Sequence, residues 1–587
     1  MGGDPLLILG GGPAGLAAAH ELVARGHRPT VCEARSQVGG IARTETYKGF
    51  GFDIGGHRFF TKNERIDRLW RRRMGADFLK VARLSRIYYR GRFFQYPLSL
   101  PNTVANLGLR ESALIALSYG AARVFPHPEE ENFEQWVSNR FGQRLYETFF
   151  RTYTEKVWGI PCTRIQADWA AQRIQGLSLA AAVANALLGG RRAKSLIDEF
   201  DYPRLGPGMM WERFRDEIER GGGRVRCGCE AVRLTHDGRR VTGVGLRENG
   251  RDLDVRADQI ISSVPLHRLV RLLEPAAPEP VLRAASHLTY RSFLMVGLLV
   301  DRPALFPDQW IYVHSPDVKV GRIQNFKNWS AALAPDPART NVGMEYFCDE
   351  GDELWCLPDS ALGALAAREL GALGLAEAAD VCDSFVVRQP DAYPIYDQGY
   401  KEHLTVIREY LAGFENVQTV GRAGMHRYNN MDHSMLTGIL GAENAVGAQH
   451  DLWAVNDEEE YLEEGQRGRA TPAAEVLVAT TLARLDKLAL ATAVGTVSGL
   501  ALFCATLWLV IKGGAVVGPN LGLLSQYFAG YTVSVEGSFV AFGYSFLWGF
   551  LFGWLLAYTR NLAVAFYVHH VKRRGASVSL ATLLDRV

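Results

Sequence analysis

The chain begins with a short apolar run that leads directly into a glycine-rich turn. Residues 6–9 are Leu-Leu-Ile-Leu, and the spacing Gly10-x-Gly12-x-x-Gly15 and a helical pattern over residues 16–23 follow at once. In a strand-turn-helix unit the first glycine makes the turn, the second lets a pyrophosphate approach the backbone, and the third lets the helix pack on the strand. The N-terminus therefore predicts a dinucleotide-binding unit, with phosphates at the first amides of the helix.

A second strand strengthens this interpretation, because a lone glycine fingerprint also occurs in other α/β proteins. Residues 30–33 are Thr-Val-Cys-Glu, which predict a strand that ends in an acid at the spacing expected of a ribose ligand. The glycines and arginines that follow extend the pattern. Together they resemble the fingerprint of FAD-containing oxidoreductases of the glutathione-reductase and amine-oxidase type. The resemblance implies FAD as the cofactor, with these ligands: Gly10, Gly12, Gly15, Glu33, Arg35, Gly39, Gly40 and Arg43.

Composition bounds the size and the partners of the protein. A chain of 587 residues is long enough for about three to four domains. A formal net charge of +2 gives no reason to expect nucleic acid as a partner. The eight cysteines include no CxxC pair, and Cys227-Gly-Cys229 fits a strand and turn better than a metal or redox site. This usage favours a reducing cytoplasm, and no metal site is predicted.

The C-terminal part contains two long apolar stretches, at about residues 488–511 and 539–558. Each is long enough to cross a bilayer, although a pair of buried core helices is the alternative. Arg484 and Lys487 precede the first stretch, and basic residues at 560 and 572–574 follow the second. Basic flanks stay in the cytoplasm, so the sequence predicts a hairpin in the inner (cytoplasmic) membrane with the flavin domain on the cytoplasmic side.

The order of predicted strands and helices indicates an α/β protein with a Rossmann-like, glutathione-reductase-type FAD domain built from separated segments. A helical pattern begins at Asn102, and residues 133–150 form one of its long periodic stretches. The strand predicted at residues 260–265 returns to the first domain. The predicted parts are an FAD domain at 1–80, 200–290 and 415–452, a helical module at 81–199, a sheet-containing module at 291–414, an acidic linker at 453–475, and a membrane domain at 476–587.

Four further stretches carry a more specific resemblance. In chain order they are Gly55-Gly56-His57-Arg58-Phe59-Phe60-Thr61, Tyr153-Thr-Glu-Lys-Val-Trp158-Gly159, Tyr290-Arg291-Ser292 and Gly421-Arg422-x-Gly424-x-x-Arg427-Tyr428-Asn-Asn-Met431. Over about residues 4–450 the chain is similar to the UDP-galactopyranose mutases, within the flavoprotein superfamily that includes protoporphyrinogen oxidase and the amine oxidases. Residues 202–208 and 261–265 lean towards the oxidase branch.

The mutase resemblance implies roles for particular residues. Gly56 would let the backbone approach FAD, and His57 after it would lie beside the flavin ring. Tyr153 and Trp158 would stack on a sugar or base. Arg173 aligns, after a one-residue gap, with an arginine that binds the diphosphate of a sugar nucleotide, and Arg291 is a weaker candidate. The alternative for His57 is a structural role, and the alternative for Tyr153 and Trp158 is packing in a helix core. The alternative for Arg173 is an ion pair at the surface. The remaining residues implied to close on FAD or its substrate are Arg422, Tyr428, Asn430 and Met431. A helix that begins near Asn430 would aim its free amides at the pyrophosphate or the flavin edge.

The sequence departs from the mutase pattern at one position. The family carries an acid where this chain has Asn430, and Asp432 lies two residues further on. An amide cannot carry the charge of a carboxylate, so the pose of the substrate is open. Residues 393–396 resemble a segment that supplies an active-site tyrosine, which is either Tyr393 or Tyr396.

Two reactions follow from these resemblances. In the mutase reaction reduced flavin attacks the anomeric carbon of a nucleotide or lipid-linked sugar, and the sugar ring changes between pyranose and furanose without net redox. In the oxidoreductase reaction FAD takes a hydride from an isoprenoid or other lipid-linked substrate. Either needs an external electron donor or acceptor, such as NAD(P)H or a quinone. A third hypothesis is a flavin-binding membrane scaffold without turnover. The sequence makes no prediction about oligomeric state.

Overall fold

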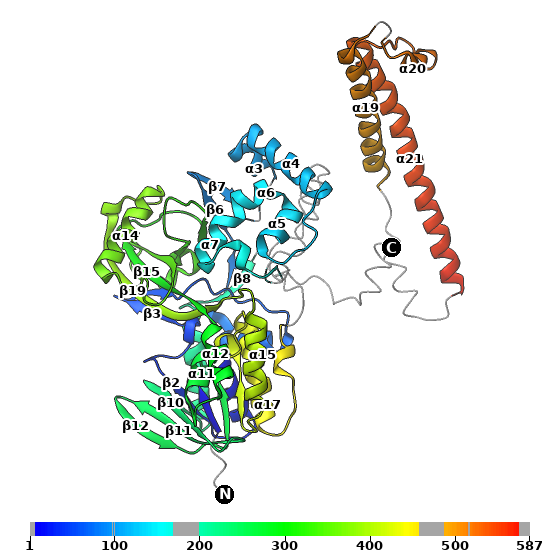
Figure 1. Ribbon diagram of the computed structural model, residues 1–587. Coiled ribbons are helices and arrows are strands. Elements are labelled where there is room, and N and C mark those ends of the chain that lie inside the picture. Colours follow the sequence, from blue (N-terminus) through cyan, green and yellow to red (C-terminus); the bar gives the residue numbers. More distant parts are fainter. Residues whose placement is uncertain are drawn as a thin grey trace. The chain divides into compact units, whose positions relative to one another are not determined.

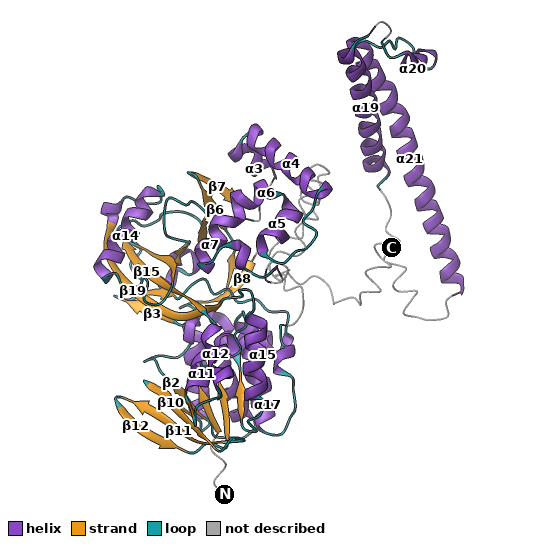
Figure 2. Ribbon diagram, in the orientation of Figure 1, coloured by secondary structure: helices purple, strands orange, loops and turns teal. Residues whose placement is uncertain are grey.

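The computed structural model describes residues 6–96, 98, 100–167, 169, 199–456, 486–514 and 517–574, with only the backbone described from residue 564 on. The chain divides into two compact units between Gly465 and Gln466. Figure 1 shows the course of the chain and Figure 2 its helices and strands.

A five-stranded parallel sheet lies at the centre of the dinucleotide region, with β1 as its middle strand. The apolar residues of β1 are buried, because elements cover both faces of the sheet. As predicted, the strand near residue 260 returns to pair with β1. The strands, in sheet order, are β20 (Val417–Thr419), β13 (Gln259–Ser262), β1 (Leu6–Leu9), β2 (Thr30–Glu33) and β9 (Arg224–Cys227).

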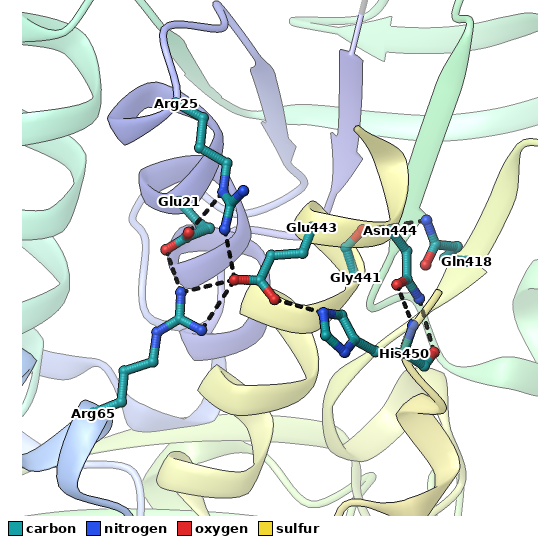
Figure 3. Close-up of polar contacts among 8 residues, drawn as sticks. All are labelled: Glu21, Arg25, Arg65, Gln418, Gly441, Glu443, Asn444 and His450. Carbon is teal, nitrogen blue, oxygen red and sulfur yellow. Dashed lines mark hydrogen bonds and ion pairs between the residues drawn. The ribbon is translucent and has the colours of Figure 1, made fainter. Parts of the chain in front are cut away.

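Two helices from opposite ends of this unit pack closely together: α1 (Pro13–Ala24) and α17 (Met431–Ala445). Gly438 permits the contact, since a Cβ there would come within 2.0 Å of the Ala14 carbonyl oxygen. An ion cluster also joins them (Figure 3). The Glu443 carboxylate of α17 accepts from Arg25 at 2.7 Å and from Arg65 at 3.1 Å. These contacts fix the middle and the C-terminal end of α17 against α1.

Besides two small two-stranded sheets, the first unit contains two mixed sheets. One has the order β12 (Arg251–Val255), β11 (Val241–Glu248), β10 (Cys229–His236) and β14 (Leu273–Glu274). The other has the order β19 (Val381–Pro394), β15 (Tyr290–Val300), β18 (Thr340–Cys348), β17 (Arg322–Asn325), β16 (Trp310–Val313), β6 (Ser85–Tyr89) and β7 (Arg92–Gln95). Strands β6 and β7 lie within the segment 81–199, which the sequence predicts as a helical module, yet they extend the sheet of the later segment.

The helical module contains α3 (Leu100–Leu107), α4 (Leu109–Val124), α5 (Phe133–Phe141), α6 (Gln143–Leu145), a π-helical turn (Tyr146–Arg151) and α7 (Thr152–Trp158). The periodic stretch at 133–150 does not form one regular helix. It is interrupted at Gly142, which has φ +83° and lies against α4, where a Cβ would come within 2.7 Å of the Tyr119 amide nitrogen. Tertiary contact therefore decides this break.

The other elements of the first unit connect these layers. They are β3 (Thr44–Tyr47), β4 (Phe50–Asp53), α2 (Glu64–Met74), β5 (Phe78–Ala82), β8 (Glu199–Pro203), α10 (Gly208–Arg220), α11 (Leu266–Arg271), α12 (Glu279–His287), α13 (Phe326–Trp329), α14 (Asp359–Ala372), α15 (Tyr400–Leu411) and α16 (Gly421–Gly424).

The second unit contains α19 (Lys487–Lys512), α20 (Pro519–Gly522) and α21 (Val535–Arg574). Both α19 and the first part of α21 are long and apolar enough to cross a membrane. They pack through small residues: a Cβ on Gly495 would come within 2.8 Å of the Phe546 carbonyl oxygen, and one on Gly553 within 2.9 Å of the Leu490 carbonyl oxygen. Small residues at such a contact let two backbones approach within a bilayer.

Candidate active site

A cavity of about 1000 Å³ opens at the glycine turn and continues between the mixed sheet and the helical module. Four separate parts of the chain line its first end: the turn after β1, the end of β2, the turn around residue 40 and the start of α17. Among the residues predicted as cofactor ligands, the following line it: Gly10, Gly12, Glu33, Arg35, Gly40, Gly56, Arg422, Asn430 and Met431.

The glycines of the turn have distinct geometries. Gly10 has φ +106°, which favours glycine. Gly12 and Gly40 face each other, and a Cβ on Gly40 would lie 3.2 Å from the Gly12 Cα. Gly15 does not line the cavity; a Cβ there would come within 1.9 Å of the Gly10 carbonyl oxygen. The first glycines therefore leave backbone open to a ligand, whereas Gly15 lets α1 approach β1.

Glu33 lies at the carboxyl end of β2 with both carboxylate oxygens engaged. One accepts from the Gly11 amide at 2.6 Å and the other from the Arg35 amide at 2.9 Å. Each Glu33 carboxylate oxygen keeps a lone pair that can accept a hydrogen bond from a hydroxyl group, such as those of a ribose. Arg43 lies behind the wall, almost fully buried, where it donates to the Gly40 carbonyl oxygen at 2.8 Å and supports that turn. Gly39 also lies behind the wall and packs against Trp211 and Arg43.

Two helix N-termini face this end of the cavity. Helix α1 begins with Pro13 after Gly12, and α17 begins with Met431 after Asn430, as the sequence predicts for a helix start there. The first amides of a helix have no partner within it and carry partial positive charge, so paired N-termini favour an anion. Together with the open glycine backbone and the buried acid, they make this end suitable for a dinucleotide with its pyrophosphate.

His57 lines the cavity beyond the glycine turn, and its Nε2 lies 2.8 Å from the Ile54 carbonyl oxygen. Burial lowers the pKa of His57 to about 4, and the nearby guanidinium of Arg422 acts in the same direction. The imidazole is therefore neutral at physiological pH, with Nε2 as the donor to Ile54.

An aromatic and guanidinium cluster forms the next part of the wall. Tyr393 and Tyr428 are stacked with ring centroids 5.8 Å apart, and the Arg422 guanidinium lies 4.5 Å from the Tyr428 ring centroid. Trp158 meets both tyrosines, at 6.3 Å and 6.2 Å. We refer to Trp158, Tyr393, Arg422 and Tyr428 as the aromatic cluster. It offers flat apolar faces beside a fixed positive charge, which suits a ring attached to an anionic group.

Arg322 in β17 is a cavity residue that sequence reasoning missed. It pairs with the fully buried Glu345 of β18 at 2.6 Å and donates to the Tyr393 hydroxyl at 2.9 Å. Burial opposes the charge of Arg322, but the Glu345 carboxylate and the neighbouring tyrosines together outweigh it, and the pKa of the guanidinium is raised. Gln324 donates to the other Glu345 oxygen at 2.8 Å. No motif marks these residues, because adjacent strands bring them together.

Tyr153 lies on the cavity wall and stacks on His314, with ring centroids 4.5 Å apart and an interplanar angle of 11°. The loop that carries His314 is held by Lys156, whose Nζ donates to carbonyl oxygens at both ends of residues 313–320. Lys156, in the same motif as Tyr153, therefore fixes the stacking partner of Tyr153.

The remaining candidates lie elsewhere. Arg291 pairs with Asp349 at 2.6 Å and donates to the Phe347 carbonyl oxygen at 3.1 Å, so its guanidinium is engaged away from the cavity wall. Of the two tyrosine alternatives, Tyr393 lines the cavity, whereas the Tyr396 hydroxyl accepts from the Tyr428 amide at 2.7 Å. Arg173 lies outside the described residues.

A family model shows which protein family the chain belongs to. The model of the flavin containing amine oxidoreductase family matches residues 13–445, which is most of the chain. The protein belongs to this family. As a member of the flavin containing amine oxidoreductases it is a flavoenzyme, and its cofactor is FAD. The dinucleotide end described above fits that cofactor in its glycines, its acid and its helix N-termini.

Several relatives share this family's fold. Coproporphyrinogen III oxidase of Mycobacterium leprae is 27% identical over 462 residues, which cover 71% of this chain and 93% of that protein. The protein named "Probable UDP-galactopyranose mutase" from Klebsiella pneumoniae is 24% identical over 177 residues, 29% of this chain and 44% of that protein. A crystal structure of reduced UDP-galactopyranose mutase has a TM-score of 0.68 at 21% identity and covers 77% of this chain and 98% of that one.

Proposed function

We propose that the protein is a mutase-like flavoenzyme that interconverts the pyranose and furanose forms of a nucleotide-linked or lipid-linked sugar without net redox. The observation that carries this proposal is the aromatic cluster beside the dinucleotide end of the cavity. A stacked tyrosine pair, an indole and a guanidinium suit a sugar joined to an anionic diphosphate. The TM-score of 0.68 to reduced UDP-galactopyranose mutase supports the same fold.

In this proposal the ligands of FAD are the predicted residues at the cavity wall. Glu33 would accept from the ribose. The backbone at Gly10 and Gly12 and the first amides of α1 would hold the pyrophosphate, and Met431 would lie at the flavin end. Bound and reduced, FAD supplies the nucleophile for the anomeric carbon. Gly15, Gly39 and Arg43 shape the turns from behind.

The protein's own residues orient the substrate and stabilise charge. Arg422 and Arg322 supply positive charge for the leaving diphosphate, and Tyr393, held by Arg322, presents a fixed phenol. Neutral His57 holds its place through Ile54 and adds no charge next to the flavin. Tyr153, Trp158 and Tyr428 are proposed to contact the sugar or base. Arg173 is proposed as a further diphosphate ligand on the basis of the sequence alone.

A second candidate is an FAD-dependent oxidoreductase that removes hydride from a lipid-linked or isoprenoid substrate. Similarity to coproporphyrinogen III oxidase extends over 462 residues, far beyond the 177 matched to the mutase sequence. For either reaction, the proposal includes electron exchange with NAD(P)H or a quinone. It also places the protein in the cytoplasmic membrane with the flavin unit on the cytoplasmic side.

The two functions are separated by one assay. The purified, FAD-loaded full-length protein is reduced with dithionite and given UDP-galactopyranose, and the sugar is analysed for furanose. Formation of furanose while the flavin stays reduced supports the mutase. In a parallel sample that is kept oxidised and given an isoprenoid substrate, reduction of the flavin, with no furanose formed in the first sample, would replace the mutase with the oxidoreductase.

A further inference from the structure

The cavity has one arm with apolar walls. Beyond the aromatic cluster it runs into the helical module, where α3, α4, α5 and the π-helical turn provide its walls. Among the described lining residues between Ile87 and Trp169, none carries a charge. The walls of this apolar arm include Val104, Ile115, Phe133, Phe141, Leu145 and Phe149.

Such walls favour a hydrocarbon over a polar ligand. A phosphate, sugar or base placed among these side chains would lose its hydrogen bonds to water without replacement, which is unfavourable for each unpaired group. An apolar chain instead gains free energy with each CH₂ that it buries. The guanidinium groups of Arg322 and Arg422 lie at the aromatic cluster, where the arm begins, so these two parts of the cavity match an amphipathic molecule with an anionic head.

Helix α4 forms one wall of the arm and is also apolar on its outer side. Ser112 and Ile115 line the cavity, whereas Leu109, Leu117 and Val124 point the other way, with 81%, 70% and 68% of their surfaces exposed. Phe125, just after the helix, is 82% exposed. Exposed apolar side chains grouped on one side of a helix mark an interaction surface, so this outer side favours an apolar neighbour.

A bilayer is the neighbour that the chain itself indicates. The C-terminal unit holds two helices able to cross a membrane. Exposed Arg110 and Arg123 lie near the two ends of α4, where they can meet lipid phosphates while the apolar side enters the interface. Lipid beneath α4 would give a hydrocarbon chain a route into the arm without crossing water.

We propose that the apolar arm binds the hydrocarbon tail of a lipid-linked substrate, taken from the bilayer at α4, while its phosphate-linked head lies at the aromatic cluster. The reaction at that head rests on the proposed function, whereas the tail site does not. The inference thus selects a lipid-linked substrate over a freely soluble nucleotide sugar.

The test uses full-length, FAD-loaded protein in phosphatidylcholine nanodiscs, since an alkyl detergent would compete for the arm. The probe is dodecyl phosphate that carries a photoreactive diazirine near the tail end, and labelled peptides are identified by mass spectrometry. We expect label on residues 100–124 and 133–158, and we expect unlabelled dodecyl phosphate, but not inorganic phosphate, to remove it.

Ser112→Trp fills the arm and should lower this labelling about tenfold, equivalent to about 1.4 kcal/mol. Ala113→Trp, on the exposed side of the same helix, should leave it unchanged.

Label confined to the C-terminal helices or to exposed residues, or labelling that inorganic phosphate removes equally well, would overturn the proposal. The competition experiment needs only the wild-type protein, so the test stands even if Ser112→Trp fails to fold. Labelling of the arm, with furanose formed by the reduced enzyme neither from UDP-galactopyranose nor from dodecyl phosphate-linked galactopyranose, would leave the tail site in place and reject the mutase. Furanose formation from UDP-galactopyranose without labelling of the arm would do the opposite.

Discussion

Tyr393 and Tyr428, which lie 35 positions apart in the sequence numbering, stack with their rings inclined by only 19°. Tyr393 comes from the end of β19, and Tyr428 comes from the segment before α17, so the stack joins the mixed sheet to the dinucleotide region. Arg322 donates to the hydroxyl of one ring, and Arg422 lies over both. The pair therefore links the two halves of the candidate active site.

Replacing Tyr393 by Phe removes the hydroxyl that accepts from Arg322 and keeps the ring stack. We expect turnover to fall about tenfold with FAD content unchanged, because a misplaced charge in a catalytic site costs about 1–3 kcal/mol. Tyr396→Phe is the matched control: it removes the contact to the Tyr428 amide and should lower stability by about 1 kcal/mol with a smaller effect on turnover. Steady-state kinetics and flavin absorbance are the measurements. Equal turnover in wild type and Tyr393→Phe would remove Tyr393 from the site.

Replacing Gly15 by Ala puts a methyl group against the backbone of the glycine turn. The new Cβ would come within 1.9 Å of the Gly10 carbonyl oxygen, so α1 must move away from β1. We expect loss of bound FAD and a destabilisation of about 3 kcal/mol or more. Gly120→Ala, in a helix and with no atom within 4 Å of the new Cβ, is the control and should raise stability by up to about 1 kcal/mol. A yellow, stable Gly15→Ala protein would contradict the assignment of the turn.

His57 makes stability depend on pH in a defined direction. Its pKa is about 4 in the folded protein and 6.5 in the unfolded chain, so between these values the unfolded state binds more protons. The contribution of neutral His57 is complete above pH 6.5 and is lost as the pH falls towards 4; at pH 5 the loss is about 2 kcal/mol. The glutamine in His57→Gln cannot titrate in this range. Between pH 7 and pH 5 the free energy of unfolding of this variant should therefore fall by about 2 kcal/mol less than that of the wild type.

Denaturant unfolding of the FAD-loaded protein at both pH values measures this difference. The exposed His127 provides the control variant His127→Gln, which should follow the wild-type pH dependence. Identical pH dependence for wild type and His57→Gln would show that His57 is protonated in the folded protein or open to water.

The orientation of the C-terminal hairpin can be tested by cysteine accessibility in cells. The exposed Ser525 lies between the two apolar helices, and Ser525→Cys is a minimal change. With the exposed Cys382 and Cys504 replaced by Ser, an impermeant maleimide added to intact cells should label Cys at position 525, and native Cys356 only after permeabilisation. The reverse pattern would place the flavin unit on the outer side.

Local features of the molecule were predictable from the sequence. The turn at Gly10 to Gly15, the acid at the end of β2, the start of α17 and the two apolar C-terminal helices all depend on residues close together in the chain. Glycine spacing, helix N-termini and the length of an apolar run leave local patterns, and local patterns are what a sequence shows directly.

Only the tertiary structure decided the rest. Arg322 meets Glu345 and Tyr393 because three strands bring them together, Tyr393 rather than Tyr396 faces the cavity, and Arg291 turns to Asp349. The break at Gly142 and the pairing of β6 with β16 also arise from contacts between distant segments. Which distant side chains meet depends on the path of the whole chain, and the motifs of this sequence fix only short stretches of that path.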